Sequence, residues 1–188
     1  MEYDEKTVSR EKIYRGNIIE IENVRVTLPN GKEATRDVVL HPGAAVIIPI
    51  SRDNELYMVR QYRKPIDKVL LELPAGKLDG NEAPEICARR ELKEETGLTA
   101  KNMDYIISIY TTPGFCNEVL HIFAATGLEE GEAGGDEDEF VSCEKVPVAN
   151  LIDMVMRGEI TDAKSIIGIF LADRIIKENL RASNEIIN

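Results

Sequence analysis

The sequence is poor in the residues that build disulfide frameworks, zinc sites and histidine-based catalytic centres. Among its 188 residues are three cysteines, two histidines and no tryptophan. Cys87, Cys116 and Cys143 form an odd set without a CxxC pair, so neither a disulfide framework nor a zinc site is indicated, and a reducing cytoplasm fits. His41 and His121 stand apart from any nucleophile pattern, and neither GxSxG nor a P-loop is present. Any stacking on a base must therefore use tyrosine or phenylalanine.

Long apolar runs and an excess of positive charge are also missing. No apolar run approaches the roughly 20 residues that span a bilayer, and the N-terminal MEYDEKTVSR lacks an apolar signal region. We therefore expect a cytoplasmic protein without a membrane partner. The formal net charge of −11 argues against nucleic-acid binding through a basic surface. An acidic enzyme with a phosphate substrate must take its positive charge from a metal ion and a few arginines.

The remaining pattern predicts a mixed α/β fold. Residues 8–40 read as β structure, with an Asn30-Gly31 hairpin signal, but they contain too few apolar residues to form a core alone. Further strands are expected at 44–50, 55–61, 69–73, 103–112 and 119–125, and helices at 147–157 and 161–181 with Thr161 as a cap. Strands, one central helix, more strands and two helices indicate a sheet sandwiched between helices. We divide the chain into an N-terminal β region, 1–41, and a main domain, 42–188.

The central helix is expected inside the stretch GKLDGNEAPEICARRELKEETGL, which begins at Gly76. Asn81 or Glu82 lies where a helix would be capped, and Pro84 suits the first turn. Gly97 suits the left-handed residue that follows the last turn. The stretch therefore reads as a loop followed by a helix.

Three carboxylates crowd the end of this helix. Glu91 and Glu95 are four residues apart and share a face, with Glu94 beside them. Like charges at this spacing repel by roughly 0.2–0.5 kcal/mol per pair, and the last turn of a helix favours cations. The cluster therefore predicts a counterion, and carboxylate oxygens suit Mg²⁺ or Mn²⁺. The alternative is a solvated acidic face on which Arg90 pairs with Glu94.

The wider pattern resembles the signature of the Nudix hydrolases. Nine positions within 23 residues match it: Gly76, Glu82, Arg90, Glu91, Leu92, Glu94, Glu95, Gly97 and Leu98. The resemblance implies an α/β/α sandwich. It also implies a pyrophosphohydrolase that cleaves a nucleoside diphosphate linked to another group, using Mg²⁺ held by the Glu91–Glu95 face.

Further features resemble the ADP-ribose pyrophosphatase branch of this family. Pro113, followed by a glycine, lies fifteen residues past Leu98, and HPGAAVIIP, QYR, LELPAGKLDG and DAK also match, so the similarity covers nearly the whole chain. It implies hydrolysis of ADP-ribose to AMP and ribose 5-phosphate, and a homodimer that exchanges its N-terminal β region. The alternatives are a broader pyrophosphatase for ADP-glucose or GDP sugars, and a catalytically silent nucleotide sensor, which the intact glutamates disfavour.

The resemblance also implies roles for single residues. Glu91 and Glu95 would be the main metal ligands with the Ala75 carbonyl, and Glu94 would bind the metal directly or support a ligand. Without the resemblance, Ala75 reads simply as part of a tight turn. Arg90 would orient the glutamates.

The expected base and substrate contacts lie outside the signature. Glu139 or Glu137, at the end of an acidic loop, would supply the base or another ligand, and the matching leaves both open. Phosphates would be held by Arg63 and Arg36, adenine would stack on Tyr14, and Glu118 would contact the terminal ribose. The alternative for Tyr14 is that it fills a local packing gap.

Overall fold

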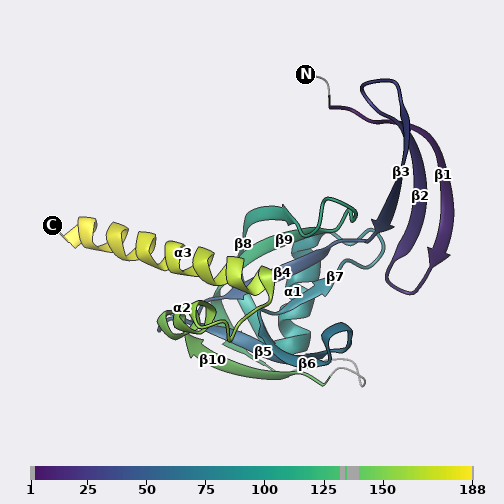
Figure 1. The fold of residues 1–188 in the computed structure, drawn as a ribbon. Coiled ribbons are helices and arrows are strands. Elements are labelled where there is room, and N and C mark those ends of the chain that lie inside the picture. Colours follow the sequence, from purple (N-terminus) through teal and green to yellow (C-terminus); the bar gives the residue numbers. More distant parts are fainter. Residues whose placement is uncertain (1–2, 132–133, 135–139, 188) are drawn as a thin grey trace.

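The N-terminal part of the chain is a separate three-stranded sheet. The computed structural model describes residues 3–131, 134 and 140–187, with side chains as far as residue 180. Strands β1 (Lys6–Arg15), β2 (Glu20–Thr27) and β3 (Glu33–Leu40) are antiparallel, in the order β1-β2-β3. The predicted turn joins β2 to β3, with Gly31 at φ 79° in the left-handed region that glycine tolerates. This sheet stands away from the main body of the molecule (Figure 1).

A mixed four-stranded sheet forms the centre of the main body. Its order is β7 (Ala75–Lys77), β4 (Ala44–Pro49), β9 (Val119–Glu130) and β8 (Leu98–Tyr110). Strands β4 and β9 are parallel, whereas the other two pairings are antiparallel. A second antiparallel sheet contains β10 (Ser142–Pro147), β5 (Glu55–Arg63) and β6 (Lys68–Glu72), and a short 3₁₀ helix, η1 (Lys64–Ile66), connects β5 to β6.

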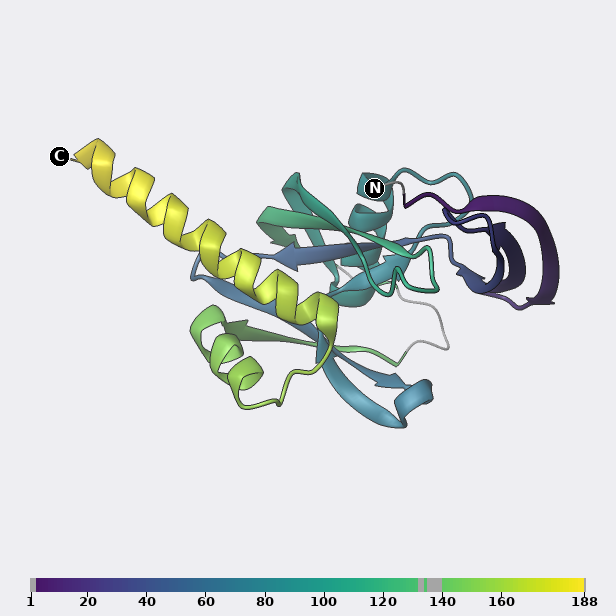
Figure 2. The same ribbon diagram turned by 45° about the horizontal axis from the view of Figure 1, so that its top comes forward.

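Helices cover both faces of the central sheet (Figures 1 and 2). Side chains alternate along β4, so Ala45 and Ile47 pack with Leu92 of α1 (Pro84–Thr96) on one face. On the other face, Ile48 packs with a cluster that includes Ile169 of α3 (Ala163–Ile187) and residues of α2 (Val148–Met156). The predicted α/β/α sandwich with a mixed sheet and an N-terminal β region is therefore confirmed. Within the described part of the chain, no helix is long and apolar enough to cross a bilayer.

The predicted helix starts need correction. Ala83 precedes α1, and no side chain caps that end, so neither Asn81 nor Glu82 is the cap. Glu82 is instead engaged by Arg90. Helix α3 begins beside Asp162, whose carboxylate accepts the Ser165 backbone N–H at 3.0 Å, so the cap is one residue later than the predicted Thr161.

Candidate active site

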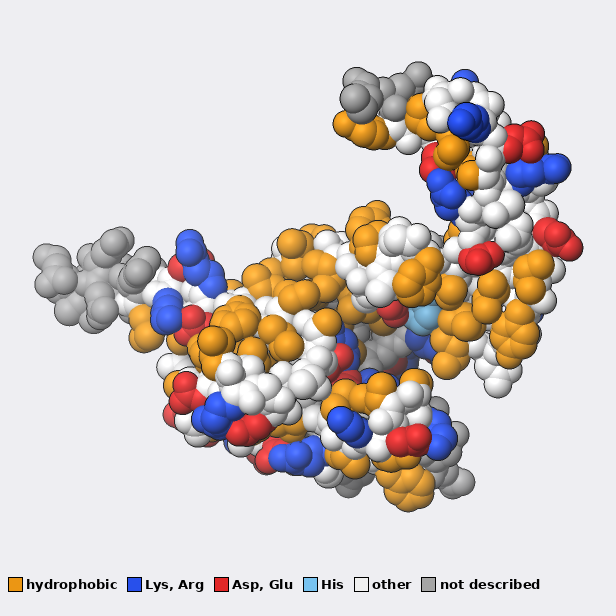
Figure 3. Space-filling view, viewed as in Figure 1, with side chains coloured by type: hydrophobic (Ala, Val, Ile, Leu, Met, Phe, Trp, Pro, Cys, Tyr) orange, Lys and Arg blue, Asp and Glu red, His pale blue; other side chains and the backbone are white. Residues whose placement is uncertain are grey.

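One large cavity, of about 700 Å³, lies beside α1 and the N-terminal end of α3. Its wall also includes the β6–β7 segment, the residues that precede β4 and β9, and the turn between β1 and β2. Acidic and basic side chains meet in this hollow, which opens toward the N-terminal sheet (Figure 3). A cavity of this size can hold a substrate as large as a nucleotide.

Strand β7 and helix α1 fit together through a glycine. A Cβ on Gly76 would lie 1.9 Å from the Glu91 carboxylate, so only glycine leaves that carboxylate its place. Glu91 and Glu95 are each 8% exposed, and Glu95 Oε2 accepts the Ala75 N–H at 3.0 Å. The segment before α1 thereby brings the Ala75 backbone to the carboxylate face of the helix.

Arg90 ties the carboxylates of this segment together. Its Nη1 donates to Glu91 Oε1 at 2.6 Å and to Glu94 Oε2 at 2.8 Å. Its Nε and Nη2 both donate to Glu82 at 3.1 Å. These hydrogen bonds, first of all those to Glu82, raise the pKa of the Arg90 guanidinium above its ordinary value. One permanent cation therefore fixes three glutamates of the signature.

The donor atoms at this face suit a hard divalent cation. Glu91, Glu94 and Glu95 offer carboxylate oxygens beside the Ala75 backbone, an all-oxygen set of the kind that Mg²⁺ and Mn²⁺ prefer. Among the described residues, no three histidine, cysteine, aspartate or glutamate side chains already converge as a metal site. Arg90 donates to one oxygen of Glu91 and one oxygen of Glu94, which orients both carboxylates.

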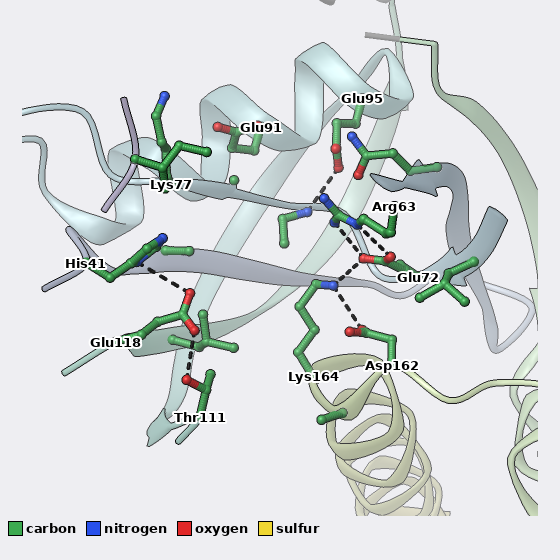
Figure 4. A pocket seen from close by; sticks show the side chains of 18 of the residues that line it. His41, Arg63, Glu72, Lys77, Glu91, Glu95, Thr111, Glu118, Asp162 and Lys164 are labelled. Carbon is green, nitrogen blue, oxygen red and sulfur yellow. Dashed lines mark hydrogen bonds and ion pairs between the residues drawn. The ribbon is translucent and has the colours of Figure 1, made fainter. Parts of the chain in front are cut away.

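The opposite wall carries a buried charge network (Figure 4). Glu72 is 1% exposed, and its two oxygens accept Arg63 Nε at 2.8 Å and Arg63 Nη2 at 2.7 Å. Lys164 forms an ion pair with the same carboxylate and donates to Asp162 Oδ2 at 2.9 Å. Burial opposes the charged form of Glu72, but the hydrogen bonds from Arg63 and the charge of Lys164 prevail and lower its pKa. Glu72 is therefore an anion held between two cations.

A third polar group lies at the end of the cavity near the N-terminal sheet. Glu118 Oε2 accepts the Thr111 hydroxyl at 2.7 Å, and Glu118 Oε1 lies 3.4 Å from His41 Nδ1. That same Nδ1 accepts the Gly43 N–H at 3.0 Å, so it has no proton to give to Glu118. His41 and Glu118 are therefore neighbours in the wall, not a hydrogen-bonded pair.

The structure brings together seven of the predicted site residues around this cavity: Arg63, Ala75, Arg90, Glu91, Glu94, Glu95 and Glu118. Two others lie elsewhere in this chain. Arg36 donates to Glu5 at 2.5 and 3.0 Å, and Tyr14 is 54% exposed on β1. Glu137 and Glu139 lie outside the described residues.

Several polar residues of the wall have no role predicted from the sequence, among them His41, Glu72, Thr111, Asp162 and Lys164. A signal for four of them existed, because HPGAAVIIP contains His41, LELPAGKLDG contains Glu72, and DAK contains Asp162 and Lys164. Those segments match the family pattern, but the pattern alone does not reveal the contacts that these side chains make.

Several known proteins are similar to this chain over most of its length. A Bacillus methanolicus protein named methanol dehydrogenase activator is 41% identical over 169 residues, covering 89% of this chain and 91% of its own. An ADP-ribose pyrophosphatase of Bacillus subtilis (strain 168) is 42% identical over 164 residues, with coverages of 86% and 89%. A GDP-mannose pyrophosphatase of Salmonella arizonae is 31% identical over 175 residues, with coverages of 86% and 91%.

The fold and the family follow from two further matches. A crystal structure of an ADP compounds hydrolase superposes with a TM-score of 0.84 at 24% identity, over 94% of this chain and 96% of the other, which establishes the shared fold. Residues 39–166 match the NUDIX domain. These residues include the whole of α1 and nearly all of the cavity wall, and the chain belongs to the Nudix family of pyrophosphohydrolases.

Proposed function

We propose that this protein hydrolyses the pyrophosphate of ADP-ribose to AMP and ribose 5-phosphate, with Mg²⁺ as cofactor and Mn²⁺ able to replace it. The observation that carries the proposal is the arrangement of one cavity, in which a carboxylate face lies across from Arg63. The similarity to an ADP-ribose pyrophosphatase extends over 86% of the chain and supports this choice of substrate.

The chemistry divides between the two walls. A divalent cation, when bound, offsets the charge of the pyrophosphate and lowers the pKa of bound water. Glu91, Glu95 and the Ala75 carbonyl would hold it, with Glu94 as a further ligand or a support. Arg90 keeps these carboxylates oriented through the hydrogen bonds described above.

The substrate would lie between Arg63 and Glu118. Arg63 uses Nε and one Nη2 hydrogen for Glu72, which leaves donors for a phosphate of the substrate. Glu118, oriented by Thr111, would accept a hydroxyl of the terminal ribose. Glu139 or Glu137 would provide the base that takes the proton of the attacking water.

We further propose that residues 1–41 are a dimerisation region exchanged between two subunits, and that residues 42–188 are the hydrolase domain. Strand β1 is exposed along its whole length, including Ile13 and Tyr14, which supports a partner surface there. In a homodimer, Arg36 and Tyr14 would serve the partner's cavity.

The expected environment is the cytoplasm, with a small nucleoside diphosphate compound as the partner molecule and no nucleic acid. The three cysteines are free thiols, as a reducing compartment favours. Burial raises the pKa of the Cys87 thiol to about 12, so this thiol is a packing residue and not a nucleophile.

The test is a substrate panel with the pure protein and Mg²⁺, with products identified by chromatography. ADP-ribose should give AMP and ribose 5-phosphate with the highest kcat/KM. A kcat/KM for ADP-glucose or GDP-mannose at least about tenfold higher, or 1.4 kcal/mol in transition-state stabilisation, would favour the second candidate, a broader nucleotide-sugar pyrophosphatase. The similarity to a GDP-mannose pyrophosphatase is the reason to include that substrate. No turnover of any compound, despite binding, would indicate a sensor.

A further inference from the structure

Lys164 enters the cavity wall from the N-terminal end of α3. Its side chain is 12% exposed and pairs with Glu72 and with Asp162. Glu72 is the same carboxylate that holds Arg63 through two hydrogen bonds, so one buried anion is shared by two cations (Figure 4). The position of Lys164 depends on contacts between residues 92 apart in sequence.

The charges of this group explain why a second cation is needed. Arg63 and Glu72 form a bidentate pair, and that pair alone is neutral. Without Lys164, the Arg63 guanidinium would be well oriented by Glu72 but would attract a phosphate only weakly. Lys164 gives the set of Arg63, Glu72 and Lys164 one net positive charge, in a cavity that contains three other acidic residues on α1.

Asp162, which pairs with Lys164, cancels only part of this gain. Its Oδ2 also accepts the Ser165 N–H at 3.0 Å and the Ser165 hydroxyl at 2.6 Å, at the N-terminal end of α3. The helix dipole favours a negative charge at that end. The helix terminus therefore offsets part of the Asp162 charge, and Asp162 also fixes the Lys164 ammonium in place.

We propose that Lys164 is a positioning residue for the substrate: it neutralises Glu72, so that Arg63 keeps its positive charge for a phosphate of the substrate. This inference deepens the proposed function and rests on it for the identity of the substrate. It assigns Lys164 no contact with the reacting atoms.

Kinetics with ADP-ribose separate this role from a structural one. Lys164→Met should raise KM about tenfold, as expected for one lost charge near a phosphate, and leave kcat nearly unchanged. Lys164→Arg should restore KM, because it restores the charge. The matched control is Lys177→Met on the same helix, which removes only an exposed ion pair of 2.7 Å with Asp173 and should change neither constant.

A charge-restoring pair of substitutions is the sharper test. The double variant Lys164→Met, Glu72→Gln again carries one net positive charge, on Arg63, so its KM should be lower than that of Lys164→Met. A direct contact between Lys164 and substrate predicts no such recovery, and an unrecovered KM overturns the proposal. If Lys164→Met does not fold, the double variant is compared with Glu72→Gln. Loss of Lys164 should change KM little in that background, because no Glu72 charge remains for it to neutralise, and a rise in KM of about tenfold overturns the proposal.

Binding of ADP, measured by isothermal titration calorimetry with Mg²⁺, keeps the proposal independent of turnover. Lys164→Met should weaken ADP binding about tenfold, while Lys177→Met should bind as the wild type does. Wild-type protein that binds ADP but does not hydrolyse ADP-ribose contradicts the proposed function and leaves the role of Lys164 intact. Equal affinity of wild type and Lys164→Met for ADP contradicts that role.

Discussion

The contact between Gly76 and Glu91 predicts that one methyl group can disable the site without unfolding the protein. In Gly76→Ala, the new Cβ would meet the Glu91 carboxylate at 1.9 Å. Gly76 lies in strand β7 and is not among the residues with positive φ, so alanine suits the backbone there. The conflict is therefore confined to the end of one flexible side chain.

The size of the effect follows from the distance. The carboxylate must retreat by roughly 1.5 Å to reach an ordinary contact of 3.4 Å. A misplacement of about 1 Å can cost a hundredfold in rate, which is about 2.7 kcal/mol of activation free energy. The fold should survive, because the carboxylate can move. An added methyl also lowers the entropy of the unfolded chain, which raises the free energy of unfolding by up to about 1 kcal/mol. For a chain of this length, that corresponds to a Tm change of about 2–4 °C.

The assay is kcat/KM for ADP-ribose at several Mg²⁺ concentrations, with Tm measured in parallel. We expect a loss of about a hundredfold and a higher Mg²⁺ requirement. In a Glu91→Gln background, Gly76→Ala should cost little more, because the displaced ligand is already lost. Wild-type kcat/KM in Gly76→Ala at limiting Mg²⁺ would refute the assignment of Glu91 as a ligand that Gly76 accommodates.

Three further predictions concern the base, the metal face and the assembly. Glu95→Gln should lower turnover by more than about a hundredfold with the fold intact, because glutamine can still accept the Ala75 N–H; near-wild-type turnover at saturating Mg²⁺ contradicts the ligand role. Glu139→Gln should lower kcat by about 10²–10⁴ with little change in KM. If Glu137→Gln loses activity and Glu139→Gln keeps it, the base lies two residues earlier. Light scattering at micromolar concentration should give twice the monomer mass; a monomer mass excludes the exchanged dimer.

Local sequence signals predicted the elements well but their ends less well. Pro84 and Gly97 bound α1 as expected, because each acts through its own backbone. A side-chain cap depends on competing partners, which sequence spacing does not reveal. Glu82 is engaged by Arg90, eight residues further on, and so leaves the start of α1 uncapped.

The two walls of the cavity differ in how far the sequence predicts their contacts. The carboxylate face lies on one helix, where a spacing of four residues fixes which side chains are neighbours. The opposite wall joins β6 to the beginning of α3, and periodicity cannot show which buried anion meets which cation. Glu72 reads as one of many glutamates in the sequence, yet it is 1% exposed and is the centre of the network.

The positions of Arg36 and Tyr14, away from the cavity of their own chain, allow a test of whether the N-terminal sheet is exchanged between subunits. The N-terminal sheet has few buried side chains, Val24 and Val26 among them, and Arg36 is paired with Glu5. If the sheet is exchanged, Arg36 of one subunit serves the cavity that contains Glu95 of the other. Arg36→Ala and Glu95→Gln proteins, each impaired alone, would then form mixed dimers with one native cavity, and an equal mixture should regain about a quarter of wild-type activity. Without exchange, each cavity in a mixed dimer keeps its own lesion. A mixture of exchanging dimers that stays as inactive as its parents would place Arg36 outside the partner's site.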